Sequence, residues 1–280
     1  MTKTPGRISS TTHRPQDPVR QPAPSADQAG KTRIKNKMNS QDSKDLKALL
    51  EGRGNFYRFL SRLYVVEVDE PLMTALRAIE IPETADDPRM AEGWKRLGGV
   101  LKDGLGDNPV ETLAVDYARI FLSAGVTAGA AYPIESVYTS PEHLVMQDAW
   151  EAVCKAYREA GFERDKSVDV HEDQLGLELA FLAHLNDRLL TVVAKDPGLQ
   201  SAENRAAFVS GLRAQKQFLE AHPLRWVHDF CRDVRKCPGS DFYPAVSLLT
   251  EGFIDMDAAL VDDLIAEYGR DGALGAAAEA

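Results

Sequence analysis

Apolar residues recur at three- and four-residue steps along almost the whole folded part of this sequence. The clearest run places Leu175, Leu179, Leu182 and Leu185 on one stripe, which Phe181 widens. This spacing puts side chains on one face of an α-helix, and no alternating strand pattern competes with it. The sequence therefore predicts an all-α fold, a helical bundle of about ten helices in two packed halves.

Local signals place the ends of these helices. Pro71, Pro88 and Pro109 each stand where a first-turn residue loses nothing by lacking an N–H, and Gly161 is typical of a helix end. Ser140 is expected to cap the helix that Gly161 ends. The expected helices span about 44–65, 71–79, 87–101, 109–122, 141–160, 171–189, 202–220, 223–235, 241–254 and 258–268.

The chain is expected to divide into two helical halves, 44–168 and 169–270, joined by the polar segment SVDVHEDQ. Such a joint allows two chains to exchange their halves, so we expect a monomer that can also form a domain-swapped dimer. Residues 1–43 lack the apolar side chains needed for a core and are interpreted as a disordered basic tail, with Met38 as a plausible true start. Residues 271–280 are expected to be frayed.

Charge divides the chain in the same way. The first 45 residues hold nine Lys and Arg against four Asp, a net +5, so the overall −10 leaves −15 on the rest. An acidic surface argues against nucleic acid as the main ligand and favours partners that present Lys or Arg. No run approaches the roughly 20 apolar residues that cross a bilayer, and no secretory signal is present. We therefore expect a cytoplasmic protein, whose three cysteines are free thiols.

Enzyme motifs are not found. The six histidines form no H-E-x-x-H pair, and the glycine-rich pieces contain no G-x-G-x-x-G or G-K-[ST]. Asp262 and Asp263 resemble the start of an Asp-rich magnesium motif, but Ala266 holds the place of the third aspartate. The sequence predicts no catalytic residue, no metal site and no cofactor. His184, and the pair Trp226 and Phe230, are interpreted as core residues.

Several ordered segments together carry a family resemblance. They read DYARIFLSAG, AYPIESVYTS, PEHLVMQD, HEDQLGLELAFLAHL and WVHDFCRDVRKCPGSDFYPAVSLLTEGF, and they span about residues 46–257. Together they resemble the TorD/DmsD/NarJ family of redox-enzyme maturation chaperones. The resemblance implies a cytoplasmic all-helical protein that binds the twin-arginine signal peptide, and often the body, of a molybdopterin-containing oxidoreductase until cofactor insertion is finished.

The joint departs in part from the family pattern. The family has Glu-Pro-acidic-Asp-His followed by an apolar residue, and here the matching residues run from Val170 to Leu175. Asp173 is retained, so the resemblance implies that it acts here as a cation acceptor. Gln174 stands where the family has its His, and the Pro is missing, so the role of that His cannot be carried over.

A receptor for a twin-arginine signal needs carboxylates at one end of an apolar groove. The carboxylates are expected to be Glu135, Glu172, Asp173 and Glu178. The apolar part is expected to consist of Tyr117, Ile120, Phe121, Tyr132, Ile134 and Tyr138, and Pro133, Ser136 and Gln174 complete the predicted peptide-binding set. Two simpler interpretations stay open: the spacing of Tyr117, Ile120 and Phe121 also fits a core stripe, and Glu172 and Asp173 also fit a solvated first helical turn.

Two other functions remain open beside the chaperone. One is a helical scaffold or regulatory interaction protein that kept the fold but lost peptide recognition, which the altered joint permits. The other is a metal-dependent helical enzyme. Selective binding of Arg-Arg apolar peptides separates the chaperone from the scaffold, and elemental analysis of the purified protein tests the enzyme.

Overall fold

The computed structural model describes the backbone of residues 26–122, 130–165 and 167–270, and side chains from residue 43 within these ranges. The chain divides between Asn39 and Ser40 into two compact units. Of the first unit, the structure describes helical backbone from Ala26 to Asn39. Parts of the predicted tails, residues 1–25 and 271–280, lie outside the described residues. All that follows concerns the second unit.

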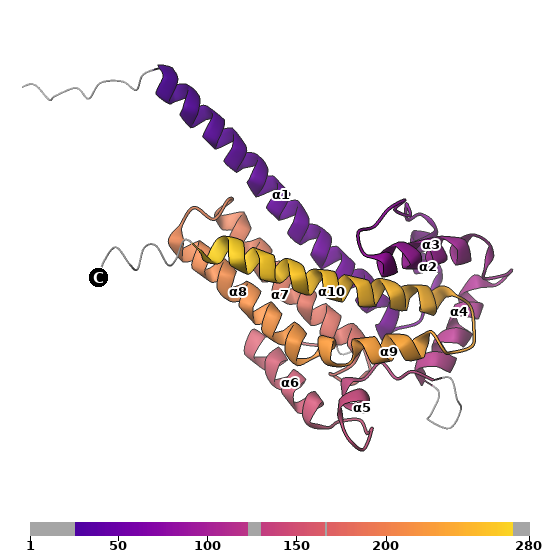
Figure 1. Ribbon diagram of the computed structural model, residues 1–280. Helices are drawn as coiled ribbons and strands as arrows, with labels where there is room; N and C mark the ends of the chain where they lie inside the picture. The colour runs from indigo at the N-terminus through magenta and orange to yellow at the C-terminus, as the bar shows by residue number, and fades with distance from the viewer. Residues whose placement is uncertain (1–25, 123–129, 166, 271–280) are drawn as a thin grey trace, which may run out of the picture. The chain divides into compact units, whose positions relative to one another are not determined.

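The fold is all-α, as predicted (Figure 1). The ten α-helices of the described residues are α1 (Ala26–Val65), α2 (Glu70–Arg77), α3 (Pro88–Asp103), α4 (Pro109–Tyr117), α5 (Glu135–Thr139), α6 (Asp148–Ala160), α7 (Leu175–Lys195), α8 (Ala202–Ala221), α9 (Val227–Val234) and α10 (Phe242–Gly269). A short π-helix, η1 (Ala118–Leu122), extends α4, and a 3₁₀-helix, η2 (Pro223–Arg225), precedes α9. None of the described helices is both long and apolar enough to cross a membrane.

Helix α10 lies at the centre of the packing. It contacts α3, α8 and α9, and α8 in turn packs along α7 (Figure 1). The core takes side chains from the C-terminal part of α1 as well, including Leu50, Tyr57 and Leu60, which are fully buried. This arrangement covers most of α7, whose buried residues run from Leu175 to Val193.

Helix starts follow the predicted local chemistry. Asp69 and Asp87 are the N-caps of α2 and α3, and their side chains accept hydrogen bonds from amides in the first turn, where Pro71 and Pro88 also lie. Gly161 ends α6 in the left-handed conformation, with φ of 66°. The three cysteines are free, as expected.

Several predicted helix boundaries were wrong. Helix α1 begins at Ala26 rather than near residue 44. Ser140 does not cap α6; it ends α5, because His143 and Met146 adopt positive φ values of 53° and 57°, which interrupt a helix. The predicted helix over 223–235 is broken at Trp226, whose backbone is not helical.

The last helix was also divided wrongly. The sequence suggested separate helices over 241–254 and 258–268, yet α10 is continuous. Its acidic middle does not interrupt the helix, because Asp257 is buried and paired with Arg53 of α1. The predicted division of the folded part near residue 168 stays a prediction.

Candidate functional site

The loop before α5 lies against the joint before α7. The amide of Glu135 donates to the carbonyl of Asp173 (2.9 Å), and the amide of Leu175 donates to the carbonyl of Pro133 (2.8 Å). Ile134 and Gln174 form an isolated antiparallel β-bridge between these bonds. Because the loop occupies the backbone of the joint, α7 begins at Leu175 and not near His171 as predicted. Two segments far apart in sequence therefore form one site.

Asp173 is completely buried and holds the start of α5. Its Oδ2 accepts from the amide of Ser136 (3.0 Å) and from its hydroxyl (2.5 Å), while Oδ1 has no hydrogen-bond partner among the described residues. The interpretation of Asp173 as a solvated first-turn residue is therefore wrong. Its carboxylate stabilises the N-terminal end of α5 from inside the protein.

Glu135, Asp173 and Glu178 form a buried group that we call the carboxyl cluster; each of the three residues is 0% exposed. Burial, and then the negative charges of Glu135 and Asp173, raise the pKa of Glu178 well above its usual value. Glu135 Oε2 is hydrogen-bonded to Nδ1 of His222 at 2.8 Å. Among the described residues, neither oxygen of Glu178 nor Oε1 of Glu135 accepts a hydrogen bond of ordinary geometry, although the side chains of Glu135 and Trp226 lie close enough to Glu178 to affect its pKa. The cluster thus has free acceptors and few compensating charges.

Gln174 caps α7 and ties the joint to α1. Its Oε1 accepts from the amide of Gly176 (2.6 Å), and its Nε2 donates to the carbonyl of Tyr64 (2.6 Å). The hydroxyl of Tyr117 donates to the same carbonyl at 2.9 Å. At the position where the family pattern has a histidine, this chain therefore has a buried structural amide.

The predicted aromatic groove is closed in this conformation. Tyr117, Ile120 and Phe121 are 5% exposed or less, and the Phe121 ring contacts Tyr243 with centroids 4.9 Å apart. These three residues occupy core positions, which was the simpler interpretation. Tyr132, Ile134 and Tyr138 are half-buried, and Tyr138 stacks on Trp226 at 5.4 Å. Whether the set contacts a peptide stays a prediction.

Glu172 is the carboxylate of the predicted set that solvent reaches. Its Oε2 accepts from the indole N–H of Trp150 on α6 (2.6 Å), and its Oε1 lies 3.6 Å from a guanidinium nitrogen of Arg164. The hydroxyl of Tyr157 donates to its backbone carbonyl at 3.0 Å. Glu172 is thus already oriented to accept a guanidinium group at the surface of the joint.

Sequence reasoning missed the residues that complete the site: Tyr64, Trp150, Tyr157, Arg164 and His222. Each comes from a segment that no motif connects to the joint, and His222 lies 87 positions from its partner Glu135. The expectation that Trp226 and Phe230 pack in the core is confirmed, because both are buried and their rings meet at 5.6 Å. Their i, i+4 spacing in the sequence had indicated this packing.

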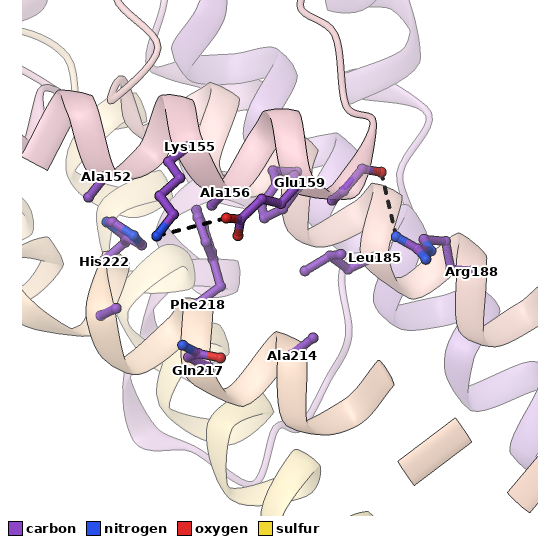
Figure 2. Close-up of a pocket in the computed structure, with 13 residues that line it drawn as sticks. Ala152, Lys155, Ala156, Glu159, Leu185, Arg188, Ala214, Gln217, Phe218 and His222 are labelled. Carbon is purple, nitrogen blue, oxygen red and sulfur yellow. Dashed lines mark hydrogen bonds and ion pairs between the residues drawn. The ribbon is translucent and has the colours of Figure 1, made fainter. Parts of the chain in front are cut away.

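A pocket of about 390 Å³ opens beside this site, between α6, α7 and α8 (Figure 2). Phe181, Leu185 and Phe218 are among the residues that line it, together with His222. Nowhere in the described ranges do three or more His, Cys, Asp or Glu side chains gather in a way that could hold a metal ion. The site offers carboxylate acceptors and apolar surface.

Comparison with known proteins places these features in a family. Residues 83–232, which include the joint and the carboxyl cluster, match the model of the nitrate reductase delta subunit family. The chaperone protein TorD of Vibrio cholerae serotype O1 (strain O395) is 28% identical over 229 residues, which cover 80% of this chain and 98% of the relative. The probable Tat proofreading chaperone DmsD of Haemophilus influenzae is 27% identical over 156 residues, 56% of this chain and 63% of the relative. The chain belongs to the nitrate reductase delta subunit family, in agreement with the resemblance in its sequence.

Proposed function

We propose that the protein is a cytoplasmic maturation chaperone, not an enzyme, that binds the twin-arginine signal peptide of a molybdopterin-containing oxidoreductase, and also its apo-form. The observation that carries this proposal is the alignment with TorD, which is named a chaperone and is matched over 98% of its length. DmsD, named a probable Tat proofreading chaperone, supports the same class of partner. We further propose a monomer that can exchange halves to form a dimer.

The joint supports recognition of guanidinium groups. Glu172 at its surface already lies beside the guanidinium of Arg164, so an arginine of the peptide can take the place of an internal one. Carboxylates bind guanidinium groups through paired, charge-assisted hydrogen bonds. The carboxyl cluster lies behind this position and contains oxygen atoms that accept no hydrogen bond of ordinary geometry from the described residues. A peptide reaches the cluster only if the loop moves away from the joint.

We expect moderate affinity. Burying about 400 Å² of apolar peptide surface yields on the order of 10 kcal/mol at about 25 cal/mol per Å². Ordering the peptide and opening the joint consume much of this free energy. Micromolar binding suits a chaperone that must release its cargo.

The test is calorimetric titration of the full chain with the twin-arginine signal peptides of the molybdopterin oxidoreductases of the same organism. Each peptide is run beside a version whose two arginines are replaced by glutamine. We expect micromolar binding that weakens by roughly tenfold or more with glutamine, because charge-assisted hydrogen bonds contribute about 1.5–3 kcal/mol each. If none of the peptides binds, the proposal is wrong and a scaffold role becomes the better one.

Glu172→Gln separates recognition by the joint from general attraction to an acidic protein. We expect this variant to weaken binding of the arginine peptide and to leave the glutamine peptide unchanged. Glu163→Gln is the matched control, because Glu163 is an exposed glutamate close in sequence. Equal weakening by both variants would indicate that only net charge matters.

A further inference from the structure

The carboxylate of Glu172 already has a cationic partner from the same chain. Its Oε1 lies 3.6 Å from Nη2 of Arg164, and the two side chains are 28% and 30% exposed. Its Oε2 accepts from the indole N–H of Trp150 at 2.6 Å. A guanidinium group binds a carboxylate best through two parallel hydrogen bonds, one to each oxygen. An arginine from outside therefore competes with Arg164 for the Glu172 carboxylate.

Arg164 is kept near this carboxylate by its own segment of the chain. Its Nη1 donates to the carbonyl of Val168, four positions further on. The segment is fixed to α6 through Phe162, whose amide donates to the carbonyl of Tyr157 at 2.9 Å and whose ring meets the Tyr157 ring at 4.8 Å. A group on a short tether has a high local concentration, typically millimolar. Arg164 is therefore always available to pair with Glu172.

Glu172 keeps its orientation without Arg164. The hydroxyl of Tyr157 donates to its backbone carbonyl at 3.0 Å, and Trp150 holds its Oε2. The next residue, Asp173, is completely buried, which fixes the backbone on that side. All three constraints come from outside the Arg164 segment. Removing the Arg164 guanidinium should therefore leave an oriented carboxylate that is open to a ligand.

A second arginine lies near Glu172 without contacting it. Trp150, Cys154 and Arg158 lie at i, i+4 and i+8 and share one face of α6. Burial raises the pKa of the Cys154 thiol; the charge of Glu172 raises it further, and that of Arg158 opposes this. The Arg158 side chain is exposed, and within the described ranges it forms no ion pair. The two arginines thus bring similar charge to this surface, and the contact with the carboxylate distinguishes Arg164.

Building on the proposed function, we infer that Arg164 is an internal competitor for the arginine site of the signal peptide. In the free protein its guanidinium pairs with Glu172. A peptide arginine binds there by displacing it, while the hydrogen bond from Arg164 to Val168 does not depend on Glu172 and can remain. When the peptide leaves, Arg164 pairs with Glu172 again. Arg164 thus lowers the affinity for the twin-arginine motif and favours release of the cargo.

The test removes the competitor and leaves the carboxylate. Arg164→Gln removes the charge of a partly exposed side chain, and Arg158→Gln is the matched control, because it removes one positive charge nearby without breaking an ion pair. Fluorescence anisotropy measures binding of the fluorescein-labelled twin-arginine peptide that the wild-type protein binds in calorimetry. We expect Arg164→Gln to bind this peptide about two- to fivefold more tightly than Arg158→Gln does, the range that exposed ion pairs usually contribute.

A double-mutant cycle assigns the gain to the ion pair. The gain from Arg164→Gln should disappear when Glu172→Gln is also present, and it should be absent for the peptide whose arginines are replaced by glutamine. Arg164→Lys is a second variant that keeps the charge but loses the forked geometry, so its gain should be smaller. It repeats the comparison if the glutamine variant does not fold, which circular dichroism shows.

The outcomes separate this inference from the proposed function. If Arg164→Gln binds the twin-arginine peptide no more tightly than Arg158→Gln, or gains equally in the Glu172→Gln background, the inference is overturned while the chaperone proposal stands. Weaker binding by Arg164→Gln would overturn it as well, because Arg164 would then help to hold the peptide. Absence of peptide binding by the wild-type protein would instead refute the proposed function on which the inference rests.

Discussion

The buried ion pair of Arg53 and Asp257 makes the sharpest stability prediction. Arg53 is 4% exposed and donates through Nε and Nη2 to the two carboxylate oxygens of Asp257, at 2.6 and 2.9 Å. Asn186 and Gln215 each accept one further guanidinium hydrogen bond, and Tyr57 donates to Asp257 at 2.5 Å. Burial lowers the pKa of Arg53, but the hydrogen bond and charge of Asp257 outweigh it and raise that pKa. The network joins α1, α7, α8 and α10.

Asp257→Ala is expected to lower the free energy of unfolding by about 4 kcal/mol. Breaking a buried ion pair costs about 3–5 kcal/mol, because the remaining charge stays buried without its partner. Arg53 keeps two amide partners, which reduces the cost, whereas the hydroxyl of Tyr57 loses its acceptor, which adds to it. The total is a large fraction of the roughly 5–15 kcal/mol that is usual for a folded domain.

Urea unfolding followed by far-UV circular dichroism measures this change. Asp262→Ala is the control on the same helix: Asp262 pairs with Lys216 at 2.7 Å but is 56% exposed, so its loss should shift the midpoint little. The double variant Arg53→Met/Asp257→Leu should be more stable than Asp257→Ala, because neither charge is left unpaired. A cost for Asp257→Ala as small as that of the control would refute the reasoning.

Two further predictions concern the joint. Burial and the charges of Glu135 and Asp173 raise the pKa of Glu178 in the folded protein, so wild type loses stability as pH rises from about 4.5 to that pKa. Glu178→Gln does not titrate, and its stability relative to wild type should therefore increase over this range. Unfolding midpoints between pH 4 and 9 test this, and a pH-independent difference would contradict it. Gly176→Ala should destabilise by about 1–3 kcal/mol, because the added Cβ would lie 2.9 Å from the carbonyl oxygen of Ser61; thermal unfolding measures it, and an unchanged melting temperature would count against such close packing.

Much of the fold followed from local patterns. The stripe on α7, the prolines in the first turns of α2, α3 and α4, and the glycine after α6 depend on interactions within a few residues, which sequence spacing reports directly. Predicted helix boundaries were wrong where the tertiary structure, and not the local sequence, determines the backbone. Asp257 looked like a break between helices, and it is instead a buried partner of Arg53. Ser140 looked like a cap, although the backbone of His143 and Met146 prevents a helix there.

The candidate site shows the same division. The sequence indicated that the segments around Glu135 and Asp173 belong together, and the structure brings them into hydrogen-bonded contact. It could not indicate that both carboxylates are buried or that His222 faces Glu135, because burial depends on which helices cover a residue.

The sequence by itself determined the helical class, most of the helix starts and the family, since periodicity, capping residues and ordered motifs are properties of the chain. Only the tertiary structure decided which predicted residues remain reachable. Packing of α4 and η1 into the core encloses Phe121, and the loop covers Asp173, while a pocket stays open between α6, α7 and α8. The physical reason is that helix periodicity selects an apolar face, but the partners that cover that face come from distant parts of the chain.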